Sequence, residues 1–184
     1  MNQSEPSILD RAADAALALA ADRPWSQISL LDIAAKAELG FADLYGRANG
    51  KGAVMDHLSR RFDRSALVTA AEPGEVHDRL FEAVMARIEA MEPHRHALIA
   101  ISHEEGPASM GPRLISTSKA LLETAGINTE GLKGMTRQVA MTAVWARIVQ
   151  VWRDDDGALN RTMAEIDQRL KDLRRQLSRV GAGF

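Results

Sequence analysis

Apolar residues recur at intervals of three and four along most of this chain, which is the spacing of one face of an α-helix. Runs that alternate apolar and polar residues and are rich in Val, Ile and Thr are missing, so the sequence predicts no strand. We therefore predict an all-α fold. The longer expected helices cover residues 8–21, 50–72, 76–91, 113–125, 132–152 and 159–179.

Two short helical segments separated by a tight turn lie in residues 29–51, SLLDIAAKAELGFADLYGRANGK. Ser29 is a good N-cap residue, and Asp32, three places on, can complete a capping box. Leu39 and Gly40 form the turn. The arrangement predicts a helix-turn-helix, whose second helix can lie in the major groove of DNA. That second helix carries Phe41, Leu44 and Tyr45.

This segment resembles the DNA-binding segment of the TetR family of bacterial regulators. The length of the chain and the order of its helices fit that family throughout. The matching residues are, in order, Ser29, Ile33, Ala34, Ala37, Leu44, Tyr45 and Lys51. The turn differs, because the family usually has Gly, then Val or Ile, then Ser where this chain has Glu38, Leu39 and Gly40.

The resemblance implies a TetR-like architecture in three parts. Residues 1–50 would form the helix-turn-helix domain, a helix at 50–72 would connect it, and residues 73–184 would bind an effector and dimerise. It also implies a ligand-responsive regulator, most often a repressor, that is not an enzyme and needs no cofactor. Its partner would be a double-stranded DNA operator.

The expected DNA contacts divide between phosphate and base. By resemblance, Tyr45 and Lys51 would touch the backbone. Phe41 and Ala42 can contact thymine methyl groups, and Arg47 can read guanine. The full expected set is Lys36, Gly40, Phe41, Ala42, Tyr45, Arg47 and Lys51.

The charge of the N-terminal part leaves a second interpretation open. Residues 1–70 hold 8 Lys and Arg against 9 Asp and Glu, a balance of −1, and the whole chain carries a net charge of −2. A DNA-binding domain is more often basic on its reading face. Glu38 and Asp43 lie within the helix-turn-helix itself. The segment is therefore either a DNA reader or a three-helix domain that kept its packing and lost its DNA.

A single recognition helix reads few base pairs, so we expect a homodimer that reads two half-sites. The last two helices would form the interface. The alternative is that their apolar seam packs only within its own chain. The expected interface residues are Val144, Ile148, Val151, Met163, Ile166, Leu170, Leu173 and Leu177.

The resemblance also implies a small effector among the helices of the second half. A largely apolar molecule fits the residue types, although the same residues are compatible with simple core packing. The expected lining is Phe62, Leu80, Phe81, Met85, Ile88, Leu98, Ile101, Met110, Leu114, Leu121 and Trp145.

A second resemblance gives an alternative function. Residues 79–95 and 144–170 are similar to the ubiquinone-biosynthesis accessory family, which shares the TetR fold, binds isoprenoid lipids and is not thought to need DNA. A membrane surface would be a partner only in that case. Six Lys and Arg surround the apolar seam of the final helix, and three acids offset them.

Composition narrows the chemistry further. The chain has no cysteine, so it has no disulfide and no thiolate zinc site, and a reducing cytoplasm is the simplest location. No apolar run reaches the length of a membrane span. The five histidines lack metal-ligand spacing, so we expect no metal site and no catalytic site.

Overall fold

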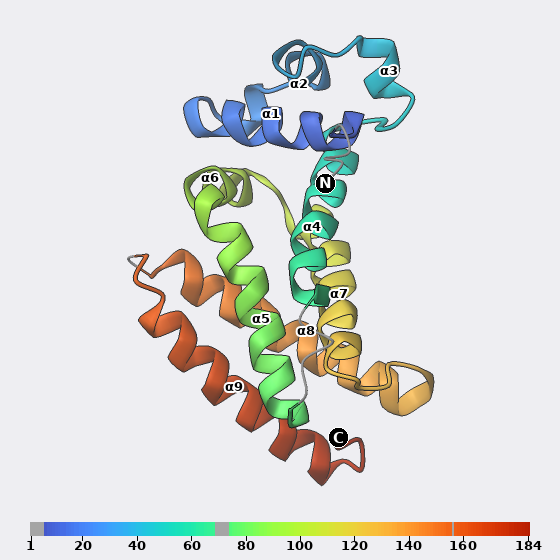
Figure 1. Ribbon diagram of the computed structural model, residues 1–184, viewed down its shortest axis with the longest axis vertical. Helices are drawn as coiled ribbons and strands as arrows, with labels where there is room; N and C mark the ends of the chain where they lie inside the picture. Colours follow the sequence, from blue (N-terminus) through green and yellow to red (C-terminus); the bar gives the residue numbers. More distant parts are fainter. Residues whose placement is uncertain (1–5, 69–73, 156) are drawn as a thin grey trace, which may run out of the picture. The chain divides into compact units, whose positions relative to one another are not determined.

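The computed structural model describes residues 6–68, 74–155 and 157–184 of the 184-residue chain, and these residues form helices without a strand. The predicted all-α fold is confirmed. The α-helices are α1 (Ile8–Asp22), α2 (Leu30–Lys36), α3 (Phe41–Tyr45), α4 (Lys51–Val68), α5 (Val76–Met91), α6 (Arg95–Glu104), α7 (Pro107–Thr124), α8 (Gly131–Arg153) and α9 (Asn160–Arg179), with short 3₁₀ turns η1 (Trp25–Gln27) and η3 (Glu92–His94) (Figure 1).

Capping boxes start α1 and α2. The Ser29 hydroxyl accepts a hydrogen bond from the amide of Asp32 at 3.1 Å, and the Asp32 carboxylate accepts one from the amide of Ser29 at 2.8 Å. Ser7 and Asp10 make the same reciprocal pair at the start of α1. Each box satisfies two amides that have no partner inside the helix. The expected N-cap at Ser29 is therefore confirmed.

The start of α7 differs from the expectation. The sequence predicts a helix that begins at residue 113, whereas α7 begins at Pro107 and continues through Pro112. Pro107 occupies the first turn, where the amide that proline lacks would have no helical partner. Pro112 removes one hydrogen bond near the helix start, and the remaining turns are long enough to maintain the helix.

The described residues form two compact units that divide within α4. The first unit runs up to Arg61 and includes His94–Met110, and the second contains Phe62–Pro93 and Gly111–Phe184. We had expected residues 73–184 to form one domain, but α6 packs with the first unit. Residues 69–72, the end of the expected connecting helix, lie outside the described part of the chain.

Small residues hold the first unit together. Ala12, Ala13 and Ala16 of α1 are fully buried. Their short side chains let α2 and α6 approach α1 closely, and α1 and α6 lie against each other (Figure 1). Arg61, in the last part of α4 that belongs to this unit, pairs with Asp14 of α1 at 2.8 Å.

The second unit is built around α9, which lies against both α8 and α5 (Figure 1). The apolar seam predicted for the last helix turns inward, because Ile166, Leu170, Leu173 and Leu177 are buried within the chain. The indole of Trp152, at the end of α8, donates a hydrogen bond to the Glu92 carboxylate at 2.6 Å. A buried tryptophan is stable here because its one polar atom has a partner.

Candidate nucleic-acid interface

The segment α2–turn–α3 forms the predicted helix-turn-helix. Ile33 and Ala34 of α2 and Leu44 of α3 are buried at 1% exposure or less, and they fix the two helices to the rest of the first unit. The amide of Leu39 bonds back to the carbonyl of Ala34 at 2.9 Å, which closes the end of α2. Buried side chains on one face leave the opposite face of α3 in solvent.

Arg11 of α1 stabilises the turn between α2 and α3. Its Nη2 donates to the carbonyl oxygens of Ala37 at 2.7 Å and Glu38 at 3.1 Å. These carbonyls follow the last turn of α2 and have no partner within the helix. The guanidinium therefore fixes the path of the chain between α2 and α3.

Glu38 adopts a backbone conformation that favours glycine. Its φ is +55°, the left-handed region, which is unfavourable for residues with a Cβ atom. The family resemblance puts glycine near this position. The turn thus holds a residue with a Cβ atom in a conformation that glycine adopts without strain.

The exposed face of α3 is partly aromatic. The Phe41 side chain is 44% exposed and the Tyr45 side chain 56%, and their ring centroids lie 6.0 Å apart. Gly40, Ala42 and Arg47 are exposed beside them. Such a face offers apolar contacts, a hydroxyl and a guanidinium to a groove, which are the groups that bind bases and phosphates.

The cations around α3 are not all equivalent. Lys36 and Arg47 are exposed, and neither side chain makes a hydrogen bond or ion pair with another described residue. Asp43 lies at the start of α3 with its carboxylate beside Gly40. The Asp32 carboxylate accepts hydrogen bonds from Ser29, which lower the pKa of Asp32. It also pairs with Arg23 at 3.6 Å. The Asp32 carboxylate therefore stays charged and is already paired within the first unit.

The side chain of Lys51, by contrast, makes its contacts within the first unit. Its ammonium donates to the carbonyl of Trp25 at 2.6 Å and lies 4.5 Å from the centroid of the Trp25 ring. Partial burial lowers the pKa of Lys51, and the charge of Glu104 opposes this effect. We predicted a phosphate contact for Lys51, but the structure gives its ammonium two internal partners.

Glu104 at the end of α6 completes this arrangement, and the sequence analysis did not identify it. Its two carboxylate oxygens accept hydrogen bonds from the amides of Trp25 at 2.8 Å and Ser26 at 2.7 Å. The hydrogen bonds from Ser26 lower the pKa of Glu104. Because 79 residues separate Trp25 from Glu104, no local pattern could have indicated the contact.

The residues predicted to line an effector site fall in different units. Leu98, Ile101 and Met110 belong to the first unit, and the others belong to the second. Within the second unit, Phe81 and Leu114 are partly exposed. The buried members there are Phe62, Leu80, Met85, Ile88, Leu121 and Trp145.

The predicted dimer residues are mostly interior residues of a single chain. A side chain with almost no exposed surface offers little area to a second copy, so burial does not favour an interface role for those six, and the interface stays a prediction. The apolar seam serves intrachain packing, which was the alternative we had left open. Val144 is partly exposed and Met163 exposed, while the buried six are Ile148, Val151, Ile166, Leu170, Leu173 and Leu177.

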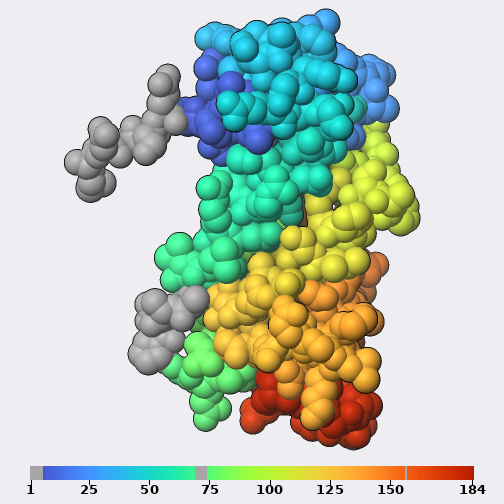
Figure 2. All heavy atoms as spheres, turned by 90° about the vertical axis from the view of Figure 1, so that its right-hand side faces the viewer, coloured from blue at the N-terminus to red at the C-terminus, as the bar shows by residue number. Residues whose placement is uncertain are grey.

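A different face of α8 is exposed and apolar. Leu132 is 81% exposed, Met135 61% and Val139 73%, and Ala143 continues the line in solvent. These four positions follow helical spacing and lie opposite the buried face that carries Met141, Trp145 and Ile148. We call them the α8 stripe. Figure 2 shows the start of α8, in orange, on the surface of the second unit.

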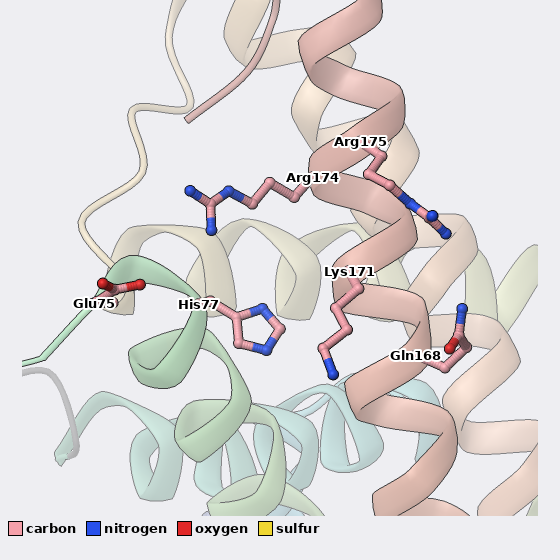
Figure 3. Close-up of a pocket in the computed structure, with 6 residues that line it drawn as sticks. All are labelled: Glu75, His77, Gln168, Lys171, Arg174 and Arg175. Atoms are coloured by element: carbon pink, nitrogen blue, oxygen red, sulfur yellow. The ribbon is translucent and has the colours of Figure 1, made fainter.

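A polar pocket of about 480 Å³ lies between the start of α5 and α9 (Figure 3). Most of its charge is already compensated, because Lys171 pairs with Asp167 at 2.6 Å and Arg175 pairs with Asp172. None of the predicted effector residues borders it. Its lining consists of Glu75, His77, Gln168, Lys171, Arg174 and Arg175.

Two other classes of site were searched for in the described residues. These residues contain no group of three or more His, Cys, Asp or Glu side chains placed to hold a metal ion. No described helix combines the length and the apolar character needed to cross a lipid bilayer.

No protein-family model matches the chain, and no curated protein matches its sequence. Solved structures do match. A TetR transcriptional regulator from Rhodococcus sp. RHA1 aligns with a TM-score of 0.66 at 14% identity, covering 89% of this chain and 93% of that one.

Two further matches are regulators linked to the degradation of n-alkanes or of fatty acids. The TetR family repressor AlkX from Dietzia sp. strain DQ12-45-1b, implicated in biodegradation of n-alkanes, aligns with a TM-score of 0.60 at 16% identity over 92% of this chain and 98% of that one. The fatty acid degradation regulator FadR from Bacillus halodurans aligns with a TM-score of 0.56 at 18% identity over 93% and 96%. The chain therefore has the fold of TetR regulators over nearly its whole length. These matches give no support to the similarity with ubiquinone-biosynthesis accessory proteins.

Proposed function

We propose that this protein is a DNA-binding transcriptional regulator of TetR type, acting as a ligand-responsive repressor. The observation that carries the proposal is the exposed Phe41–Tyr45 face of α3, which stands on the buried Leu44 in a fold shared with transcriptional regulators. Exposed aromatic residues on a five-residue helix do not help the domain to fold. A role in contacting a partner explains them. Work on chromosomal DNA would place the protein in the cytoplasm.

Each side chain of the face has a proposed role. Phe41 and Ala42 contact thymine methyl groups, and Arg47 reads guanine or a neighbouring phosphate. Lys36 and the hydroxyl of Tyr45 bind the backbone, while Gly40 allows close approach. Lys51 acts indirectly, because its bond to the Trp25 carbonyl fixes the start of α4 next to α3.

The regulator acts as a homodimer in this proposal. One α3 covers few base pairs, so two copies would read half-sites about 34 Å apart. The α8 stripe supports a second copy as the partner, because three large apolar side chains in a row are exposed on one helix face. Met163 and Val144 are available to extend that interface.

The effector would bind in the second unit and shift the population between forms that can and cannot bind DNA. Phe62, Met85 and Trp145 are the residues that best suit an apolar body. Methionine side chains adapt their shape to a ligand more readily than branched ones.

Selection of bound fragments from genomic DNA tests the proposal. We expect the full chain to enrich a short inverted repeat, and Phe41→Ala or Arg47→Ala to relax its sequence while keeping affinity for bulk DNA. Val180→Ala is a matched control, since it also truncates an exposed apolar side chain but lies outside both the DNA face and the α8 stripe. It should enrich the same repeat.

Two results would contradict the proposal. One is the absence of any enriched sequence from folded protein. The other is protein that ignores DNA and carries a co-purified isoprenoid lipid by mass spectrometry, which would favour the lipid-binding alternative.

A further inference from the structure

A charged pair is buried in the interior of the second unit. Arg87 of α5 donates through Nε to the Oδ1 atom of Asp63 on α4 at 2.7 Å, and both side chains are less than a tenth exposed. Thr117 of α7 joins them, since its hydroxyl accepts from Nη2 of Arg87 at 3.2 Å and donates to Asp63 at 2.9 Å. Well-packed apolar residues often stabilise a core as well as such a pair does. Its presence therefore calls for a reason other than stability.

Two aromatic rings and a methionine sulfur surround the guanidinium of Arg87. Its central carbon lies 4.8 Å from the centroid of the Trp145 ring and 6.0 Å from that of Phe62, and Nη1 lies 2.7 Å from the Met91 sulfur. Burial lowers the pKa of Arg87 and Asp63 opposes that effect, yet an arginine keeps its charge in proteins. A positive charge thus stands among residues that suit an apolar effector.

We propose that Arg87 is the anion-recognition group of an effector site and that Asp63 is its resident counter-ion, so that the effector carries a carboxylate on an apolar body. This inference rests on the ligand response proposed above. A guanidinium binds a carboxylate through parallel hydrogen bonds in a fixed plane. The chemistry at Arg87 selects that group over an alcohol or a hydrocarbon.

Exchange of carboxylates explains how a closed pair can admit a ligand. An incoming carboxylate that replaces Asp63 keeps the charge of Arg87 compensated throughout. An uncharged ligand that separated the pair would leave a buried ion without a partner, which is strongly unfavourable. The Thr117 hydroxyl can serve either carboxylate, and Met85 and Met91 can adapt to the apolar body.

The exchange also gives a route to the DNA-binding unit. Asp63 lies on α4, and the same helix carries Lys51 at its start in the first unit. Release of Asp63 removes a buried hydrogen-bonded anchor of α4. Because α4 is one continuous helix, the loss of this anchor changes the freedom of the segment that follows α3.

The first arm of the test removes the resident carboxylate. In Asp63→Ala, Arg87 loses its counter-ion and a space the size of a carboxylate opens. We expect acetate to raise the Tm of this variant by at least about 2 °C more than chloride at equal ionic strength. Acetamide should give no such rise, and wild type and Asp14→Ala, which loses an exposed carboxylate, should not distinguish acetate from chloride.

The second arm uses wild-type protein, so it does not depend on the folding of a variant. We expect octanoate to raise its Tm and 1-octanol, with the same tail, to leave it unchanged. Arg87→Met, which keeps an unbranched apolar stem and removes the guanidinium, should lose the response to octanoate. Neither arm uses DNA, so the result is separate from the test of DNA binding.

The proposal requires both arms. It is overturned if acetate protects Asp63→Ala no better than chloride does, or if octanol stabilises wild type as much as octanoate. Release of a bound operator by octanoate, where DNA binding has been shown, would join the inference to the proposed function. Octanoate that binds without releasing DNA would show that Asp63 does not control α4 and would overturn the regulatory part.

Discussion

Single residues with the same charge have different roles in the helix-turn-helix. Lys36, Arg47 and Lys51 are alike in the sequence as cations close to the recognition helix. In the structure, the first two are exposed without an internal partner, whereas the Lys51 ammonium is held by Trp25. A cation with a short internal hydrogen bond must break it to reach phosphate. Lys36 is therefore the better candidate for a phosphate contact, and the Arg47 side chain is placed to read a base.

Asp10 makes the stability of the first unit depend on pH. Hydrogen bonds from Ser7 and His57 lower its pKa to about 2 from an ordinary 3.8. A carboxyl group whose pKa is lower in the folded state stabilises the fold above the unfolded-state pKa. That contribution is lost as the pH falls through the folded-state pKa. We expect Asp10→Asn to reduce the free energy of unfolding by about 1–2 kcal/mol near pH 6.

The difference between wild type and Asp10→Asn should stay constant in urea titrations from about pH 6 to about pH 4.5 and shrink between about pH 4 and about pH 2. Asp14→Asn is the control, because its carboxylate pairs with Arg61 but is 61% exposed, and its effect should stay under about 1 kcal/mol. An Asp10→Asn deficit that is equally large at both ends of the pH range would contradict the role of the Asp10 charge.

Glu38 gives a second prediction for a single residue. Glycine has no Cβ atom and accepts φ of +55° without strain, so Glu38→Gly should raise the free energy of unfolding by about 1 kcal/mol. The Arg11 hydrogen bond to its carbonyl is unaffected by the change. Ala35→Gly, at an exposed position inside α2, should instead lower it by about 1 kcal/mol. Urea unfolding measures the free energy of unfolding of both variants. If both substitutions lower it, the turn at Glu38 is not strained.

At the scale of elements, the helices could be predicted from periodicity and caps, while their partners could not. The spacing of Ile166, Leu170, Leu173 and Leu177 identified the buried face of α9 correctly. The same spacing could not say whether that face meets its own chain or a second copy, because both require apolar side chains. Contacts such as Glu104 with Trp25 depend on tertiary structure alone.

The α8 stripe gives a prediction at this scale. Val139→Lys places a charge in the middle of the proposed interface, so sedimentation equilibrium should show a shift from dimer to monomer with helicity unchanged by circular dichroism. Val180→Lys, also at an exposed valine but beyond α9, should leave the dimer intact. A dimer that persists in Val139→Lys would place the interface outside the α8 stripe. A wild-type protein that is monomeric would contradict the proposed homodimer.

At the scale of the whole molecule, α4 and α7 each contribute residues to both compact units. The overall fold was predictable from the order of helices, but the assignment of α6 to the first unit was not, because it depends on packing against α1. The fold brings an exposed α3 face and a buried ion pair into one chain. Together they fit a protein that binds DNA and responds to a ligand.

The most direct measurement of the central claim is binding of the full chain to its selected duplex by fluorescence anisotropy at several salt concentrations. We expect the logarithm of the binding constant to fall linearly with the logarithm of salt concentration. Lys36→Ala should reduce that slope by about one, whereas Lys51→Met should lower stability and leave the slope unchanged. A folded protein whose binding is absent or independent of salt would contradict the claim that the α3 face reads DNA.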